Sequence, residues 1–311
     1  MKKIFLMLSI LLFISKTAAQ QDPGYTQYMY NMNIINPAYA TGKSSMLNLG
    51  SLYRTQWVGA VGSPKTITLF AHTQLNKKIE VGFSAISDDI GDGAKKENNF
   101  YADVAYVLPL AGQHKVSFGM KVGLKSIATN FNGFRLESGN TATDAAFSEN
   151  IDIVKPNIGV GAFYFTDKYY IGLSAPNLLP TNHISSRAGI NANGTESIHA
   201  FLTAGYVFTL SESFKLKPAF MSKFVQNSPL NLDLTANVLY RDKFELGAAY
   251  RFGDAVSALM NVQATKNIKI GYAYDHTLSN LGKFNSGSHE IFILFNLDLL
   301  GKGYDKSPRF F

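Results

Sequence analysis

The chain has 311 residues and no cysteine, so any catalytic chemistry must come from its histidines, hydroxyls and carboxylates. Ser288, His289 and Glu290 together have the residue types of a serine hydrolase. Such a site needs the nucleophile within hydrogen-bonding reach of the base. Because neighbouring residues of a strand point to opposite faces, Ser288 and His289 cannot simply pair. A triad assembled from distant strands is the remaining catalytic alternative.

Metal-binding spacings are also missing from the sequence. No two of the six histidines stand four residues apart, as a helical metal site requires. The carboxylates of Asp88, Asp89 and Asp92 could bind calcium, but they lack the alternating ligands and closing Glu of an EF-hand loop. We therefore expect these aspartates to lie in a solvated external loop, and we expect no metal or other cofactor.

Charged side chains recur on one face of alternating segments. The basic members are Lys115, Lys121, Lys125, Lys215, Lys217, Lys223, Lys269, Arg54 and Arg251. The acidic members are Glu80, Asp103, Asp233, Glu245, Asp275 and Glu290. Such a face either lines an anion-selective pore or forms salt bridges that fill a closed lumen.

The composition restricts the elements that can carry these charges. The chain is 46% hydrophobic but only 16% charged, and its mean hydropathy is −0.01. Ordinary soluble domains carry about 25% charge. The chain is therefore too apolar for disorder and too polar for a bundle of membrane helices.

Residues 1–19 have the order of a secretory signal peptide. Lys2 and Lys3 precede an apolar run of 11 residues, 4–14, and small residues lead to Ala19. The run is shorter than the ~20 residues of a spanning helix, so we expect cleavage after Ala19. Without Lys2, Lys3 and Lys16 the basic count falls from 29 to 26, which against 22 acidic residues leaves +4. This charge and the export signal argue against nucleic acid as a partner.

The rest of the chain alternates between apolar and polar residues. From 115 to 125 every even position is apolar, whereas the odd positions hold three lysines, two glycines and a serine. Three lysines on the covered face of a soluble sandwich would be destabilising. Strands with one apolar and one polar face instead suit a transmembrane β-barrel with a wet lumen.

We predict an antiparallel barrel of 14 strands over residues 45–299, with 12 or 16 strands as alternatives. The expected strands are 45–56, 65–75, 78–87, 98–109, 114–129, 156–166, 169–176, 198–209, 213–225, 230–240, 243–252, 254–265, 267–277 and 288–299. Connections after even strands are tight, whereas long ones (88–97, 130–155, 177–197 and 278–287) follow odd strands. This alternation predicts an outer-membrane barrel with both termini in the periplasm.

Aromatic residues recur at the expected strand ends, where interfacial girdles lie. They are Tyr53, Trp57, Tyr106, Phe163, Tyr164, Tyr169, Tyr206, Phe208, Tyr240, Tyr250, Tyr272 and Tyr274. A different aromatic segment, 20–44, precedes the first strand and holds three tyrosines and two methionines between Tyr25 and Met32. Because these side chains are costly to leave in water, the segment should pack inside the lumen or against a partner below the barrel.

Several motifs carry a resemblance to a known family. They are Asp-Pro-x-Tyr-Thr-Gln-Tyr-Met-Tyr-Asn at 22–31, Asn-Pro-Ala-Tyr at 36–39, Tyr-Arg-x-Gln-Trp at 53–57, Gly-Ser-His-Glu-Ile at 287–291 and Ser-Pro-Arg-Phe at 307–310. In this order they resemble the PorP/SprF family, outer-membrane proteins of the type IX secretion and gliding apparatus. Ser307 stands where we expect a cysteine in many members, so a role for that thiol is not implied here.

The resemblance implies a non-enzymatic barrel embedded in outer-membrane lipid. It implies that the barrel anchors a secreted surface adhesin by the adhesin's C-terminal domain, or couples to periplasmic secretion components or a peptidoglycan-binding lipoprotein. We expect the long loops 130–155 and 177–197 to meet the secreted partner. The N-terminal segment and the tail, 300–311, would meet periplasmic partners. The residues expected to do so are Tyr25, Tyr28, Tyr30, Asn36, Pro37, Tyr39, Pro308, Arg309, Phe310 and Phe311.

An open pore for small solutes is the alternative from another functional class. The N-terminal segment distinguishes the two readings, because a pore should be open whereas an anchor can be plugged or capped by residues 22–43.

Overall fold

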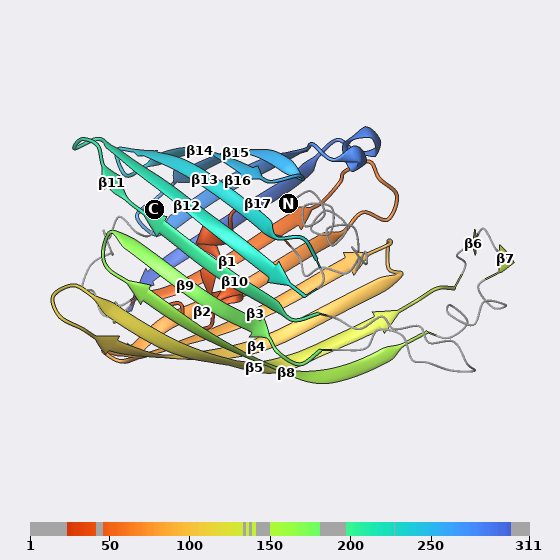
Figure 1. The fold of residues 1–311 in the computed structure, drawn as a ribbon, viewed down its shortest axis with the longest axis horizontal. Helices are drawn as coiled ribbons and strands as arrows, with labels where there is room; N and C mark the ends of the chain where they lie inside the picture. Colours follow the sequence, from red (N-terminus) through yellow and green to blue (C-terminus); the bar gives the residue numbers. More distant parts are fainter. Residues whose placement is uncertain are drawn as a thin grey trace, which may run out of the picture.

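The chain folds into one closed antiparallel β-barrel (Figure 1). The structure, a computed structural model, describes residues 24–41, 46–132, 135–136, 139–140, 150–180, 197–226 and 228–299. The wall strands are β1 (Met46–Thr55), β2 (Lys65–Asn76), β3 (Ile79–Ile90), β4 (Lys95–Pro109), β5 (Lys115–Thr129), β8 (Asp152–Phe165), β9 (Tyr169–Asn177), β10 (His199–Tyr206), β11 (Phe208–Thr209), β12 (Phe214–Val225), β13 (Asn231–Tyr240), β14 (Phe244–Arg251), β15 (Ala255–Gln263), β16 (Ile268–Thr277) and β17 (Ser288–Asp298). The short strands β6 (Arg135–Leu136) and β7 (Gly139–Asn140) pair only with each other.

Two pairings close the wall. Strand β1 pairs with β17 from Met46 opposite Asp298 to Thr55 opposite His289, and β10 pairs with β12. The sheet has 15 strands, but β10 and β11 both pair with β12 and occupy one position, which leaves 14. The predicted 14-strand barrel is confirmed.

The two rims of the barrel have different connections. Tight turns follow β2, β4, β8, β11, β13 and β15, and we call their edge the tight-turn rim. The opposite edge, the long-connection rim, carries the long β5–β8, β9–β10 and β16–β17 connections, the last containing the 3₁₀ helix η3 (Asn280–Phe284). Most of the expected loops 130–155 and 177–197 lies outside the described residues.

The prediction of a long loop at 88–97 is wrong. Strand β3 continues to Ile90 and β4 begins at Lys95, so only a short turn joins them. The strands extend because Asp89 lies opposite Lys96 and also opposite Lys65 on β2, which gives cross-strand pairs of opposite charge. The residues of 88–97 are polar, and polarity predicts a loop, but here the polar residues belong to the ends of two paired strands.

Side chains alternate between the outside and the lumen as predicted. On β5, Phe118 and Met120 are 55% and 58% exposed on the outer face, whereas Lys121 and Lys125 are each 1% exposed on the inner face. The apolar residues therefore face outward and the charged residues inward, as a barrel in lipid requires. Among the described residues no helix is long and apolar enough to cross a membrane.

Two of the predicted girdle residues lie elsewhere. Phe163 faces the lumen and is 1% exposed. Its neighbour Tyr164 points outward, since successive residues of a strand alternate between faces. Trp57 lies in the β1–β2 connection, with a φ of 47°. Most other members lie on the outer face, where Tyr164, Tyr169 and Tyr206 form a continuous row of ring contacts.

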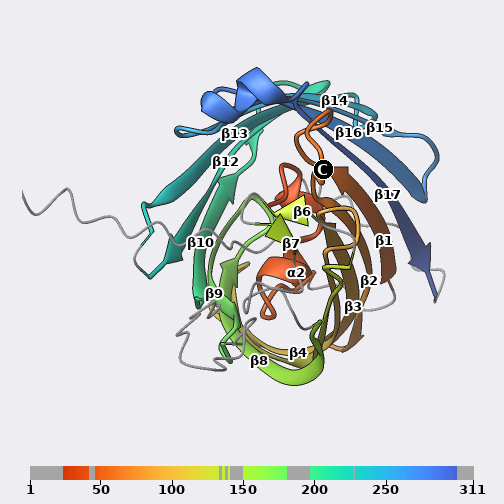
Figure 2. The same ribbon diagram turned by 90° about the vertical axis from the view of Figure 1, so that its right-hand side faces the viewer.

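The N-terminal segment lies inside the barrel (Figure 2). We call residues 24–41 the plug; it contains the 3₁₀ helix η1 (Tyr28–Tyr30) and the one-turn helix α2 (Met32–Ile35). Apolar plug side chains such as Tyr28 and Ile35 share one buried cluster with Leu52, Phe70 and Phe292 of the wall. The molecule's hydrophobic core is therefore inside the lumen and is built around the plug.

The plug runs along the barrel axis between the rims. Thr26 contacts Glu290, close to the first residue of β17 at the long-connection rim. Thr41 donates its backbone N–H to Glu80, close to the first residue of β3 at the tight-turn rim. The described chain thus begins near one rim, whereas β17 ends at the other.

Candidate functional site

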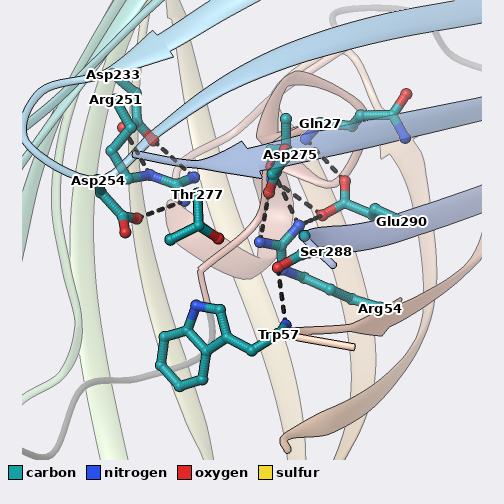
Figure 3. A network of polar contacts seen from close by, with 12 residues as sticks. Gln27, Arg54, Trp57, Asp233, Arg251, Asp254, Asp275, Thr277, Ser288 and Glu290 are labelled. Atoms are coloured by element: carbon teal, nitrogen blue, oxygen red, sulfur yellow. Dashed lines mark hydrogen bonds and ion pairs between the residues drawn. The ribbon is translucent and has the colours of Figure 1, made fainter. Parts of the chain in front are cut away.

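A buried ion-pair network joins three neighbouring wall strands (Figure 3). Arg54 on β1 lies opposite Glu290 on β17, and Asp275 comes from β16 on the far side of β17. The guanidinium Nη2 of Arg54 lies 2.6 Å from Asp275 Oδ2, and its Nη1 lies 3.1 Å from Glu290 Oε2. All three side chains are at most 3% exposed, so each charge depends on the others for compensation.

The plug completes this network. The backbone N–H groups of Thr26 and Gln27 donate to the two carboxylate oxygens of Glu290, at 3.0 and 2.8 Å. The hydroxyl of Thr26 lies 2.7 Å from Asp275 Oδ2 and also accepts from Arg54 Nη1 at 3.1 Å. The wall therefore presents a charged receptor for the first turn of the plug.

A second ion-pair group lies beside the first in Figure 3. Arg251 donates from Nε to Asp233 Oδ1 at 2.9 Å and from Nη1 to Asp254 Oδ2 at 3.2 Å. Together the two groups place two arginines and four carboxylates at the long-connection end of the lumen. Each arginine is thus shared between two carboxylates.

Tyr30 anchors the middle of the plug to a third charged cluster. Its hydroxyl donates to the carboxylate of Glu245, which also accepts from Lys269 Nζ at 2.9 Å. The Nζ atoms of Lys269 and Lys217 lie 4.5 and 5.3 Å from the centre of the Tyr30 ring. Lys269 Nζ also donates to the Tyr30 hydroxyl at 3.3 Å, so hydrogen bonds to Glu245 and Lys269 and two cation–π contacts hold Tyr30 in place.

Wall side chains also bind the plug backbone. Lys121 Nζ donates to the carbonyl of Ile34 at 2.8 Å, Ser174 donates to that of Ile35 at 2.8 Å, and Ser117 donates to that of Ala38 at 2.5 Å. A buried backbone carbonyl without a partner would destabilise the folded state. These contacts therefore fix the conformation of a segment that has little regular secondary structure.

A flat patch of glycines receives Asn36 and Pro37. Gly119 and Gly161 lie opposite each other on β5 and β8. A Cβ atom on Gly119 would lie 2.2 Å from the carbonyl oxygen of Pro37, and one on Gly161 would lie 2.1 Å from Asn36 Oδ1. The side chain of Asn36 also donates to the Ala162 carbonyl at 3.1 Å. Side chains at these wall positions would push the plug out of place.

The predicted N-terminal contact residues all belong to the plug. Tyr25, Tyr28, Tyr30, Asn36 and Pro37 are buried. Tyr39 is partly buried and makes ring contacts with His72 and Phe163, both at 5.5 Å between ring centres. The predicted tail residues lie outside the described part of the chain; they are Pro308, Arg309, Phe310 and Phe311.

The candidate hydrolase residues do not form a catalytic group. Ser288 faces the lumen and accepts the N–H of Trp57 at 3.1 Å. His289 points outward and lies 2.6 Å from the hydroxyl of Tyr272, whereas Glu290 binds Arg54. The opposite orientation of Ser288 and His289 follows the alternation of the strand, as predicted.

The three aspartates of the calcium hypothesis are separated. Asp88 lies within β3 and accepts the hydroxyl of Thr66 at 2.5 Å, whereas Asp92 lies in the following turn. Lys65 binds Asp92 at 3.0 Å, and this hydrogen bond and positive charge lower the pKa of the Asp92 carboxyl. Within the described ranges, no group of three histidine or acidic residues is arranged to hold a metal ion.

Sequence reasoning missed part of the plug's binding site. It identified the inward charges but not their contacts with Thr26 and Gln27, which are polar residues inside an otherwise aromatic segment. It also missed Gly161 and Gly172, whose role depends on the approach of Asn36. A glycine opposite another glycine on paired strands is the signal that could have revealed this patch.

Solved structures with a similar fold are outer-membrane barrels. A deletion mutant of the monoaromatic hydrocarbon channel TodX has a TM-score of 0.50 and 11% identity, covering 86% of this chain and 94% of that chain. A FadL homologue from Pseudomonas aeruginosa has a TM-score of 0.47 and 10% identity, covering 91% and 96%. Omp33 of Acinetobacter baumannii has a TM-score of 0.47 and 8% identity, covering 83% and 100%. At 11% identity, the similarity to TodX shows a shared fold and nothing more.

No curated protein sequence matches the chain. A family model does, and it extends from the end of the predicted signal peptide almost to the end of the last wall strand. Its description is "Type IX secretion system membrane protein PorP/SprF", and it matches residues 17–295. The chain therefore belongs to the PorP/SprF family of type IX secretion system membrane proteins.

Proposed function

We propose that this protein is a closed docking barrel that anchors a secreted surface protein and couples it to periplasmic components of the secretion system. The observation that carries the proposal is the plug, which packs inside the lumen and is bound at both ends and in the middle by buried wall charges. A barrel whose lumen is occupied in this way offers its two rims, rather than a channel, to other molecules.

The inward charges support a closed barrel over an anion-selective pore. A pore needs charges that can exchange partners with passing ions. Here Arg54, Lys121 and Lys269 each bind a wall carboxylate and a plug group, and each is at most 7% exposed. Moving the plug aside would take a buried hydrogen-bond partner from each of these cations, which is unfavourable even though the wall carboxylates remain.

The two rims suit different partners. The two longest connections, β5–β8 and β9–β10, lie on the long-connection rim, and long loops carry recognition on rigid scaffolds. We assign this rim to the secreted surface protein through its C-terminal domain. We assign the tight-turn rim, where β17 ends, and the tail, 300–311, to a periplasmic secretion component or a peptidoglycan-binding lipoprotein. The N-terminal aromatic residues then close the barrel instead of binding a partner.

The test is affinity purification of the tagged protein from native outer membranes, with mass spectrometry of the retained proteins. Two variants separate the two rims: one lacks residues 133–149 and 181–196, and the other lacks residues 301–311. The loop variant should lose the surface protein but keep the periplasmic component, and the tail variant should do the reverse.

Each variant serves as the folding control of the other, because both must retain the barrel. Retention of the surface protein by the loop variant at the wild-type level would overturn the assignment of the long-connection rim. Isolation of wild-type barrel with no surface or periplasmic protein attached would overturn the anchoring role itself.

A further inference from the structure

The turn between β13 and β14 carries two exposed cations beside lipid-facing aromatic rings. The guanidinium carbon of Arg241 lies 5.2 Å from the centre of the Tyr240 ring, and Lys243 Nζ lies 5.5 Å from the centre of the Phe244 ring. Tyr240 and Phe244 point outward, and the ring of Phe214 lies 4.9 Å from that of Tyr240. The cations therefore lie at the side of the barrel, where the apolar belt ends, and not beneath its lumen.

The backbone of this turn is unusual for its residues. Arg241 and Asp242 have φ values of 50° and 54°, and the N–H of Lys243 donates to the carbonyl of Tyr240 at 3.0 Å. These are the features of a type I′ turn, whose central positions favour Asn-Gly because a side chain is strained in the left-handed region. An arginine at such a position accepts backbone strain that asparagine or glycine would avoid.

The charges of the turn are not neutralised by neighbouring carboxylates. Asp242 is bound by Lys215, whose Nζ lies 2.6 Å from Asp242 Oδ1. Among the residues that the structure describes, Arg241 and Lys243 have no recorded carboxylate partner. Two cations held a few residues apart are therefore available to an external anion.

The whole tight-turn rim has the same electrostatic character. Its six turns, taken as 76–79, 109–115, 165–169, 209–214, 240–244 and 263–268, contain seven lysines or arginines but three acidic residues. The field at this rim attracts anions, and the outward tyrosines place the attraction at the depth of lipid headgroups.

We propose that Arg241 and Lys243 form a binding site for the phosphate of an anionic phospholipid. The two cations bind the phosphate oxygens, and the rings of Tyr240, Phe244 and Phe214 pack against the glycerol and the first acyl carbons. A phospholipid fits better than an acidic protein because the cations lie over outward rings at the membrane edge. The site is independent of which protein the barrel anchors.

The experiment measures binding of fluorescent phosphatidylglycerol and phosphatidylcholine to the full-length barrel in neutral detergent. The test variant is Arg241→Asn with Lys243→Gln, in which asparagine suits the left-handed backbone, so the turn stays folded. The control is Lys96→Gln with Lys283→Gln, which removes two exposed cations from the opposite rim. Wild type should prefer phosphatidylglycerol, and the test variant should lose about tenfold or more of that affinity, whereas the control should not.

Three results would overturn the proposal. The first is equal affinity of wild type for the two lipids, and the second is wild-type affinity in the test variant. The third is displacement of phosphatidylglycerol by inorganic phosphate at equal concentration, which would make the site a general anion site without a lipid component. If the test variant instead loses an acidic periplasmic protein while its lipid affinity is unchanged, the rim is a protein-docking surface.

Discussion

Gly119 is needed because the plug backbone passes directly over it. A Cβ at this position would lie 2.2 Å from the carbonyl oxygen and 2.4 Å from the carbonyl carbon of Pro37, and both are backbone atoms. We expect Gly119→Ala to lower the free energy of unfolding by about 1–3 kcal/mol, the usual cost of overpacking. Denaturant unfolding followed by the fluorescence of Trp57, the only tryptophan, measures this change.

Gly24→Ala is the matched control for that substitution. A Cβ on Gly24 meets no atom within 4 Å, so the variant should unfold like wild type. If both variants were equally stable, the close approach of the plug to β5 would be refuted.

Substitution of Arg54 should lower the free energy of unfolding more than Gly119→Ala does, because Arg54 compensates two buried carboxylates. Replacing it with methionine leaves Asp275 and Glu290 uncompensated at the long-connection end of the lumen. We expect a loss of about 3–5 kcal/mol in the free energy of unfolding, the range for a broken buried pair. The same denaturant titration measures this loss.

A compensated variant distinguishes charge from packing at this position. Arg54→Met with Asp275→Asn and Glu290→Gln removes all three charges, so most of the lost stability should return. If the triple variant is no more stable than Arg54→Met, the loss comes from packing and the electrostatic account is wrong.

At the scale of the element, the strands could be predicted more completely than the plug. The period-two alternation gives each wall strand its two faces, so the number of strands and the inward position of Lys121 and Lys269 followed from the sequence. The place of the plug depends on contacts between residues more than two hundred positions apart, such as Thr26 with Glu290. No local pattern records such a pairing, which is why the sequence left the lumen as one possibility but assigned the segment's aromatic residues to periplasmic partners.

The errors at strand ends have a similar cause. The stretch 88–97 is polar enough for a loop, but its aspartates and lysines pair across strands that extend beyond the apolar belt. Phe163 and Tyr164 are both aromatic, so composition did not indicate which of them faces lipid. In the structure Phe163 faces inward, where its ring lies against that of Tyr170.

Deletion of the plug tests whether this segment closes the lumen. Deleting residues 24–41 from the mature chain leaves the 14-strand wall but exposes Arg54, Lys121 and Lys269 to water in the lumen. We expect the deleted barrel to conduct ions, because its inner face is polar. Single-channel recording in planar bilayers measures this conductance, and a deletion variant that folds but stays silent would show that another element closes the lumen.

The absence of cysteine permits a clean test of orientation for the whole molecule. Single cysteines in place of Lys78, on the tight-turn rim, and Lys283, on the long-connection rim, give one label site each. With a membrane-impermeant maleimide on intact cells, Lys283→Cys should react and Lys78→Cys should react only after the outer membrane is broken. The opposite pattern would reverse the assignment of the rims to partners.

The central claim is that the barrel is closed by its own N-terminal segment and acts as a docking platform. The most direct measurement is the conductance of the purified full-length protein in a planar bilayer, made on wild type and on Lys283→Cys, whose maleimide labelling verifies insertion. The account predicts that inserted barrels give no steady single-channel steps, because the plug packs inside the lumen and hydrogen-bonds to its charged side chains. Steady steps of porin size from wild-type barrels would contradict it.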